Sequence, residues 1–245
     1  MKTSFVLLTT GLLVLATGCA ESSDNLSQED VIERVSTSKE DVENYHGEFV
    51  LTFELEAGLY GSQASEASYS VDMFENTQDS HGIFNSVADD TEDAMEYYKV
   101  GEEAYTNTND EGWENTSDSI DDFTNFDSDY NAMASILEDI IDKTEQTEEE
   151  NAYIYTYTGY DKTVYKAFEK PFSVELTGFD LENDTDLDVS ITVSKDTFTI
   201  ESMDYEILAE NDLGSIFMTV SVDYSDMNQL EPITIPESVI TEASE

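Results

Sequence analysis

Few side chains in this sequence could carry out nucleophilic or metal-dependent chemistry. The histidines are His46 and His81, and the one cysteine, Cys19, lies at the end of an apolar N-terminal stretch. There is no Cys/His pair for nucleophilic catalysis and no histidine cluster with the spacing of zinc ligands. The Walker loop, the dinucleotide-binding glycine fingerprint and the G-x-S-x-G elbow are also absent. We therefore expect no enzyme, no catalytic residue, no cofactor and no metal site.

Carboxylates are so numerous that close pairs occur by number alone, and two acidic segments imitate calcium loops. In Asn107-x-Asn109-x-Glu111-Gly112 the glycine stands sixth and Asp118 twelfth, as in an EF-hand loop. The leading Asp and the closing Glu are missing and strand-like segments flank it, so we interpret it as a hairpin turn. In Asp184-Thr-Asp-Leu-Asp188 the next residue is Val189 instead of glycine, and we expect a strand edge.

The composition predicts a folded and strongly acidic protein. The 245 residues include 57 Asp and Glu against 9 Lys and Arg, a formal net charge of −48. Such a balance excludes a nucleic-acid surface, which needs clustered Lys and Arg. With 39% hydrophobic residues, 14 Tyr and 12 Phe, the chain can form a core. We interpret the dispersed charge as adaptation to high salt; the alternative is a surface that gathers cations or a basic partner.

The N-terminus has the anatomy of an export signal. Lys2 precedes an apolar run from Phe5 to Leu15 that is too short for a comfortable transmembrane helix. The run ends in Ala16-Thr-Gly-Cys19, which resembles a bacterial lipobox, although Leu15 lies four residues before the cysteine instead of three. This predicts a signal peptide over residues 1–18, a lipidated Cys19 with a tether over 19–26, and a protein anchored to the outer face of the cell membrane. The alternative is an ordinary signal peptide with a free cysteine nearby.

Residue periodicity predicts an α+β fold over residues 27–245, which we treat as a single domain. Helical patterns occupy residues 27–44 and 130–143, and a short helix follows Asp161 until Pro171 ends it. Apolar residues alternate with polar ones in a strand over 49–55 and in later short runs, which suggest a meander. We expect about ten antiparallel strands in a curved sheet whose apolar face packs on two or three helices.

This order of elements resembles the LolA/LppX-like lipoprotein superfamily. Within it the chain looks like a branch of Gram-positive surface lipoproteins, on the evidence of Glu96-Tyr-Tyr-Lys-Val-Gly-Glu102, Trp113 and the C-terminal stretch from Tyr224 to Pro236. The resemblance implies a half-open β-barrel that is covered by helices and encloses an apolar cavity for acyl chains. The implied partners are the membrane and a lipid or another apolar molecule.

Apolar residues on alternating strand positions are the candidates for lining such a cavity. They are Phe49, Leu51, Phe53, Tyr69, Val71, Met73, Trp113, Tyr153, Tyr155, Tyr157, Met218 and Val220. The competing interpretation is that these side chains are plain core, packed against the helices. In that case the protein is a non-catalytic envelope interaction module with an acidic, salt-adapted surface and no ligand cavity.

Overall fold

The structure is a computed structural model that describes residues 26–57, 61–88, 91–119, 130–172, 176 and 178–244. The predicted signal peptide over residues 1–18, the lipidation of Cys19 and nearly all of the predicted tether lie outside these residues.

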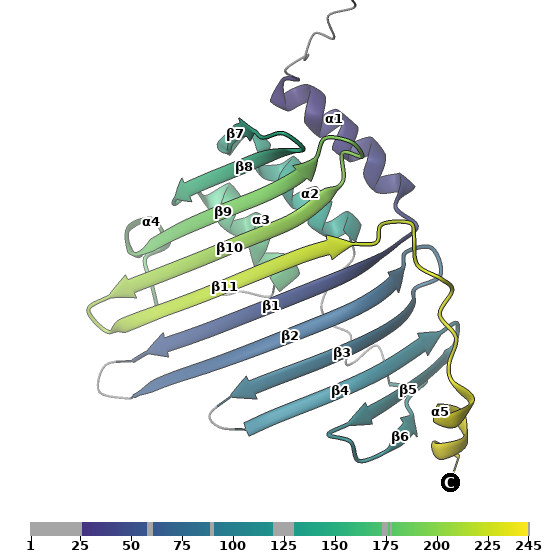
Figure 1. The fold of residues 1–245 in the computed structure, drawn as a ribbon. Coiled ribbons are helices and arrows are strands. Elements are labelled where there is room, and N and C mark those ends of the chain that lie inside the picture. The colour runs from purple at the N-terminus through teal and green to yellow at the C-terminus, as the bar shows by residue number, and fades with distance from the viewer. Residues whose placement is uncertain are drawn as a thin grey trace, which may run out of the picture.

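One antiparallel sheet runs through the described chain (Figure 1). Its central strand β1 (Asn44–Glu56) pairs with β2 (Ser62–Phe74) on one side and β11 (Gly214–Ser225) on the other. In the described residues the sheet has eleven strands in the order β6-β5-β4-β3-β2-β1-β11-β10-β9-β8-β7, so two meanders meet at the β1–β11 pair. The remaining strands are β3 (Asp79–Ala88), β4 (Thr91–Val100), β5 (Glu103–Thr108), β6 (Trp113–Asn115), β7 (Glu145–Glu148), β8 (Ala152–Gly159), β9 (Thr185–Ser194) and β10 (Ile200–Asn211).

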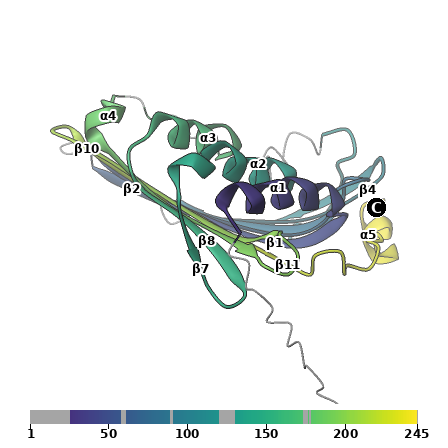
Figure 2. The same cartoon turned by 90° about the horizontal axis from the view of Figure 1, so that it is seen from above.

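On the concave side of this curved sheet lie the three longer helices α1 (Gln28–Ser38), α2 (Tyr130–Ile140) and α3 (Lys162–Phe172), together with the short α4 (Leu181–Asp184) (Figure 2). The other short helix, α5 (Glu237–Glu242), lies beside β6 at the edge of the sheet. Within the described ranges, no helix has the length and apolar character needed to cross a membrane.

Local sequence explains why these helices form and which side they bury. α1 starts at a capping box, in which the Ser27 hydroxyl accepts a hydrogen bond from the Asp30 N–H and the Asp30 carboxylate accepts one from the Ser27 N–H. Val31 and Val35, one helical turn apart, are both buried. In α2 the buried residues recur at helical spacing and face the sheet. They are Tyr130, Met133, Ala134, Ile136, Leu137 and Ile140.

The α+β prediction of a curved, unclosed antiparallel sheet packed with helices is confirmed, with differences at element ends. The first helix was expected to reach Asn44, but α1 ends at Ser38, a 3-10 turn follows, and Asn44 begins β1. Val42 is still buried because the extended chain keeps it on the same side. β7 was not predicted, since its short polar sequence carries no apolar alternation. Pro171 lies in the last turn of α3, one residue before the helix ends.

The C-terminal segment fastens the start of β1. After β11 it passes the ends of several strands and reaches α5 beside β6 (Figure 1). The Asn228 side chain accepts hydrogen bonds from the N–H groups of Glu43 (2.6 Å) and Asn44 (3.3 Å) and donates one to the Asp41 carbonyl (3.0 Å). Asn228 has a φ of +59°, a left-handed conformation that asparagine tolerates better than most residues. The tail is therefore part of the folded structure.

Candidate functional site

The register of the sheet places all the predicted lining residues except Trp113 on the concave face. Phe49 stands opposite Tyr69, and Leu51 stands opposite Val220. The same face continues through the pairing of Val220 with Tyr205 on β10, whose own partner Val189 on β9 pairs with Tyr157 on β8. Side chains from both meanders therefore meet under the helices, which sequence alternation alone could not establish.

Most of these residues are packed as core. Six of them belong to one cluster of buried side chains formed by the concave face and helices α1, α2 and α3, and five more are partly buried and packed against it. Val71, Tyr155, Met218 and Val220 are all buried. The core interpretation therefore describes the greater part of the predicted set, and the candidate site is the small region where the packing is incomplete.

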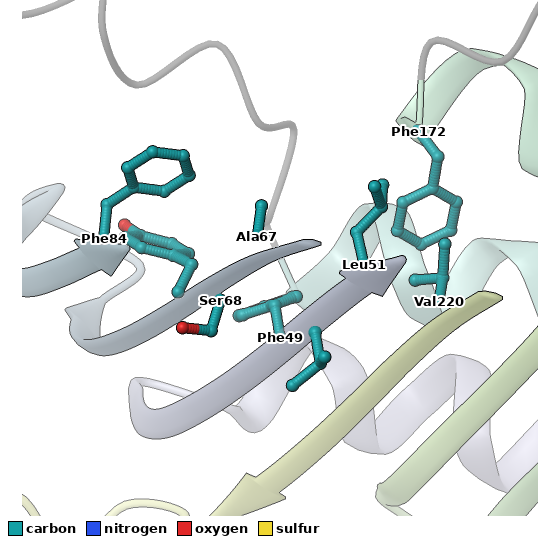
Figure 3. Close-up of a pocket in the computed structure, with 9 residues that line it drawn as sticks. Phe49, Leu51, Ala67, Ser68, Phe84, Phe172 and Val220 are labelled. Atoms are coloured by element: carbon teal, nitrogen blue, oxygen red, sulfur yellow. The ribbon is translucent and has the colours of Figure 1, made fainter. Parts of the chain in front are cut away.

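That region is an apolar groove between β1, β2, β3, β11 and the C-terminal end of α3 (Figure 3). Figure 3 shows the ring of Phe172 beside Leu51 and Val220, with Phe84 beyond Ala67. Its free volume is about 20 Å³, close to what one water molecule needs and far below the roughly 300 Å³ of a small ligand pocket. The lining residues are Phe49, Val50, Leu51, Ala67, Ser68, Tyr69, Phe84, Phe172 and Val220.

A pair of tyrosines, the buried Tyr97 and the partly buried Tyr69, borders the groove. The hydroxyls of Tyr69 and Tyr97 are hydrogen-bonded to each other, and the two rings are nearly parallel, with centroids 6.3 Å apart. Gly82 makes this possible, because a Cβ there would lie 2.5 Å from Tyr97 Cε1 and 3.0 Å from Tyr69 Cε2. Burial, together with the neighbouring Tyr97, raises the pKa of Tyr69 well above its usual range. The phenol is therefore a neutral hydrogen-bonding group at physiological pH.

Trp113 corrects the sequence-based prediction, because it lies on the opposite, convex face. Trp113 pairs with Asn107, and Asn107 pairs with Glu96. Glu96 is next to the concave-facing Tyr97 on β4, so it and its partners Asn107 and Trp113 point to the convex side. The Trp113 ring contacts Tyr98, with centroids 5.5 Å apart, and Tyr98 stacks on His81. The three-residue strand β6 contains no alternation from which its face could be predicted.

The structure adds Ala67, Phe84 and Phe172 to the groove. On β3, Ile83 and Val87 lie on the convex face and are 43% and 45% exposed, whereas Phe84 points inward and lines the groove. Phe172 follows Phe168 by four residues, and this helical spacing was an available signal. The small Ala67 gave no signal as a lining residue.

The histidines and the calcium-like segments also lie away from the groove. His46 Nδ1 is 2.7 Å from Asp72 Oδ1, and His81 Nε2 is 2.9 Å from Glu96 Oε1, all on the convex face. The segment after Asn107 is the β5–β6 turn, as predicted. The segment 184–188 enters β9, which lies between β8 and β10, so it is not at an edge of the sheet. In the described residues no three His, Cys, Asp or Glu side chains form a group suited to a metal ion.

Like charges face each other on the convex face. Asp188 stands directly opposite Glu206, and Glu48 stands opposite Asp223. His46 partly offsets the second pair, since its Nε2 lies 3.1 Å from Glu48 Oε1. Burial disfavours protonated His46, but the hydrogen bonds to Asp72 and Glu48 outweigh this and raise its pKa. The convex face is thus a strongly anionic surface, while the groove lies on the other side of the sheet.

The fold and the groove together define an open, curved sheet with helices in its concavity and a small apolar site that has no titratable acid or base except a buried phenol. Such a site can bind apolar groups. The chain belongs to a family of unknown function, DUF6612, whose family model matches residues 27–244. Comparison with curated proteins gives no match.

Several solved structures are similar in fold. They include a LolA superfamily protein, NE2245 from Nitrosomonas europaea, at 12% identity over 90% of this chain and 100% of that one, with a TM-score of 0.24. A putative outer membrane lipoprotein-sorting protein domain from Vibrio parahaemolyticus matches at 10% identity over 86% and 96% of the two chains, again with a TM-score of 0.24. MucB, in complex with MucA(peri), matches at 9% identity over 85% and 63%, with a TM-score of 0.26. LolA superfamily proteins are thus among the matches, as the sequence resemblance predicted, but values this low carry no argument about ligand or activity.

Proposed function

We propose that this protein is a non-catalytic envelope lipoprotein that binds an acyl chain or a similar apolar group in the groove between β1–β3, β11 and the end of α3. The observation that carries the proposal is the groove itself, where four strands and one helix bring apolar side chains together with incomplete packing. Burying each methylene of a bound chain contributes about 0.8 kcal/mol, so apolar contact would supply most of the affinity.

Ligand entry requires a side chain to move, because the free volume of about 20 Å³ admits no acyl chain. Phe172 is the side chain best placed to move. It stands at the C-terminal end of α3, directly after Pro171, and its ring covers Leu51 and Val220. Displacement of this ring would join the groove to the space that the ring occupies.

Co-purification tests the proposal. The mature protein, purified in high salt from cells that supply lipids, is examined by native mass spectrometry and organic extraction. We expect a stoichiometric lipid, which Ala67→Phe should expel by filling the groove. Ala64→Phe is the matched control, because it adds a ring to the opposite, exposed face of the same strand at a residue that does not line the groove. A wild-type protein that contains no lipid and ignores added lipid would refute the proposal.

The anchor is proposed on the sequence alone. Cys19 would carry two acyl chains that hold the protein on the outer face of the membrane, since two chains anchor stably where one does not. Cys19→Ala should release the protein from the membrane fraction. A Cys19→Ala protein that stays membrane-bound and uncleaved would contradict the lipobox interpretation without affecting the groove.

The second candidate is an envelope interaction module with a filled core. It is favoured by the small free volume and by the facing carboxylates of the convex surface. Such a module would bind a basic partner more weakly as salt rises, because screening shortens the range of its charges. An empty protein with salt-sensitive binding in the experiment above would favour this candidate.

A further inference from the structure

A buried tyrosine whose strand neighbour lines the groove has a hydroxyl without a hydrogen-bond partner in the described residues. Tyr205, on the concave face of β10, is 1% exposed, and in the described part of the chain its hydroxyl has no hydrogen-bond partner. Most buried polar side-chain atoms are hydrogen-bonded, because leaving one unpaired forfeits its interaction with water. A phenylalanine would fill the same space without this cost, so the hydroxyl calls for an explanation.

The position of Tyr205 connects it to the groove. Its strand partner is Val220, which lines the groove and pairs in turn with Leu51 on the other side. Tyr205 is therefore one strand spacing, about 4.8 Å, from the groove wall. Its ring lies face to face with Phe168, at 4.1 Å between centroids, and Phe168 lies 6.1 Å from Phe172. A column of three rings thus leads from the groove to Tyr205.

The surroundings of Tyr205 select a neutral ligand group. Burial and the nearby Tyr165 raise the pKa of Tyr205, so its hydroxyl stays protonated and can donate a hydrogen bond. A buried carboxylate would need a cation, and this chain has 57 acidic residues against 9 basic ones. A carbonyl oxygen accepts a hydrogen bond without bringing a charge into the core.

We propose that Tyr205 is a ligand-binding residue whose hydroxyl donates a hydrogen bond to the ester carbonyl of an acyl ester, with the acyl chain lying in the groove. The inference rests on the proposed function and adds the ligand class, a neutral acyl ester instead of a free fatty acid or a hydrocarbon. Entry would displace Phe172, so that the ester can reach the Tyr205 hydroxyl.

The test compares two probes on the mature wild-type protein and on Tyr205→Phe. Methyl palmitate carries the ester, and heptadecane has a similar chain without it. Each is delivered from cyclodextrin, and binding is measured by displacement of the neutral dye Nile red. A hydrogen bond adds about 0.5–1.5 kcal/mol net, so Tyr205→Phe should raise the Kd of methyl palmitate about three- to tenfold. The Kd of heptadecane should change less than twofold.

Two variants separate this role from a structural one. Tyr205→Phe should keep or raise the melting temperature of the ligand-free protein, because it removes an unpaired group. Tyr130→Phe should lower it, because the Tyr130 hydroxyl accepts a hydrogen bond from the Ile200 N–H at 2.8 Å. Thr185→Val removes another buried hydroxyl without a hydrogen-bond partner among the described residues. Thr185 is on β9 and pairs with Ala209, four residues along β10 from Tyr205, so this variant should leave the binding of both probes unchanged.

The outcomes are distinct. An unchanged Kd for methyl palmitate, an equal loss for both probes, or a lower melting temperature in Tyr205→Phe would each overturn the role of Tyr205 while leaving the groove in place. Tighter binding of sodium palmitate than of methyl palmitate would overturn the neutral-ester class. If the wild-type protein binds neither methyl palmitate nor heptadecane, the proposed function itself fails.

Discussion

Asn228→Ala should destabilise the whole fold, because one exposed side chain ties the C-terminal segment to the start of the central strand. The substitution removes the acceptor for the Glu43 and Asn44 N–H groups and the donor to the Asp41 carbonyl. It also places alanine at a φ of +59°, which asparagine tolerates better. The bond from the Asn228 N–H to the Asn44 carbonyl (2.8 Å) is a backbone bond and can survive.

The expected loss follows from these contacts. Three hydrogen bonds at about 0.5–1.5 kcal/mol each set an upper range, and exposure lets water replace part of them. Together with the backbone strain, we expect the free energy of unfolding to fall by about 1–3 kcal/mol. For a domain of this size that corresponds to a decrease in melting temperature of roughly 2–12 °C.

Thermal and urea denaturation of the mature protein at constant salt measure the effect. Asn228→Gly relieves the strain without restoring the side-chain bonds, so it should recover only part of the loss. Asn85→Ala is the control, because Asn85 is exposed on the convex face of β3, and it should change stability by less than about 0.5 kcal/mol. If Asn228→Ala costs no more than Asn85→Ala, the tail does not fasten β1 and the reasoning is refuted.

Three further predictions concern packing, charge and pH. Gly82→Ala should lower the free energy of unfolding by about 1–3 kcal/mol in urea titrations, because its Cβ would lie 2.5 Å from Tyr97 Cε1; an unchanged midpoint would contradict this. Glu206→Gln should stabilise the protein by about 0.2–1 kcal/mol at low salt and by much less at 1 M salt, since it removes the charge opposite Asp188. Glu54→Gln, which faces Phe217 and Ala64, should show no such gain, and equal gains would refute the pairing argument. The raised pKa of His46 gives stability that is present below its unfolded pKa of about 6.5 and is lost as pH rises through the folded value. His46→Gln should therefore cost more at pH 5.5 than at pH 8.5, and the opposite order in paired denaturation curves would exclude this role.

Local patterns in the sequence determined whether each segment is a helix or a strand and which of its residues share one face. Alternation in β1 placed Phe49, Leu51 and Phe53 on one face before any partner strand was known. The Ser27–Asp30 capping box located the start of α1.

Only the tertiary structure decided which face is covered and which residues meet on it. Val220 and Leu51 become neighbours through the β1–β11 pairing, which joins strands from opposite ends of the chain. Trp113 lies on the convex face because of the register of β6, although its residue type suggested the core. Strand alternation defines two faces without saying which one the helices will bury, and register is settled by long-range packing. For the same physical reason, the groove and the unpaired Tyr205 hydroxyl became visible only in the folded chain.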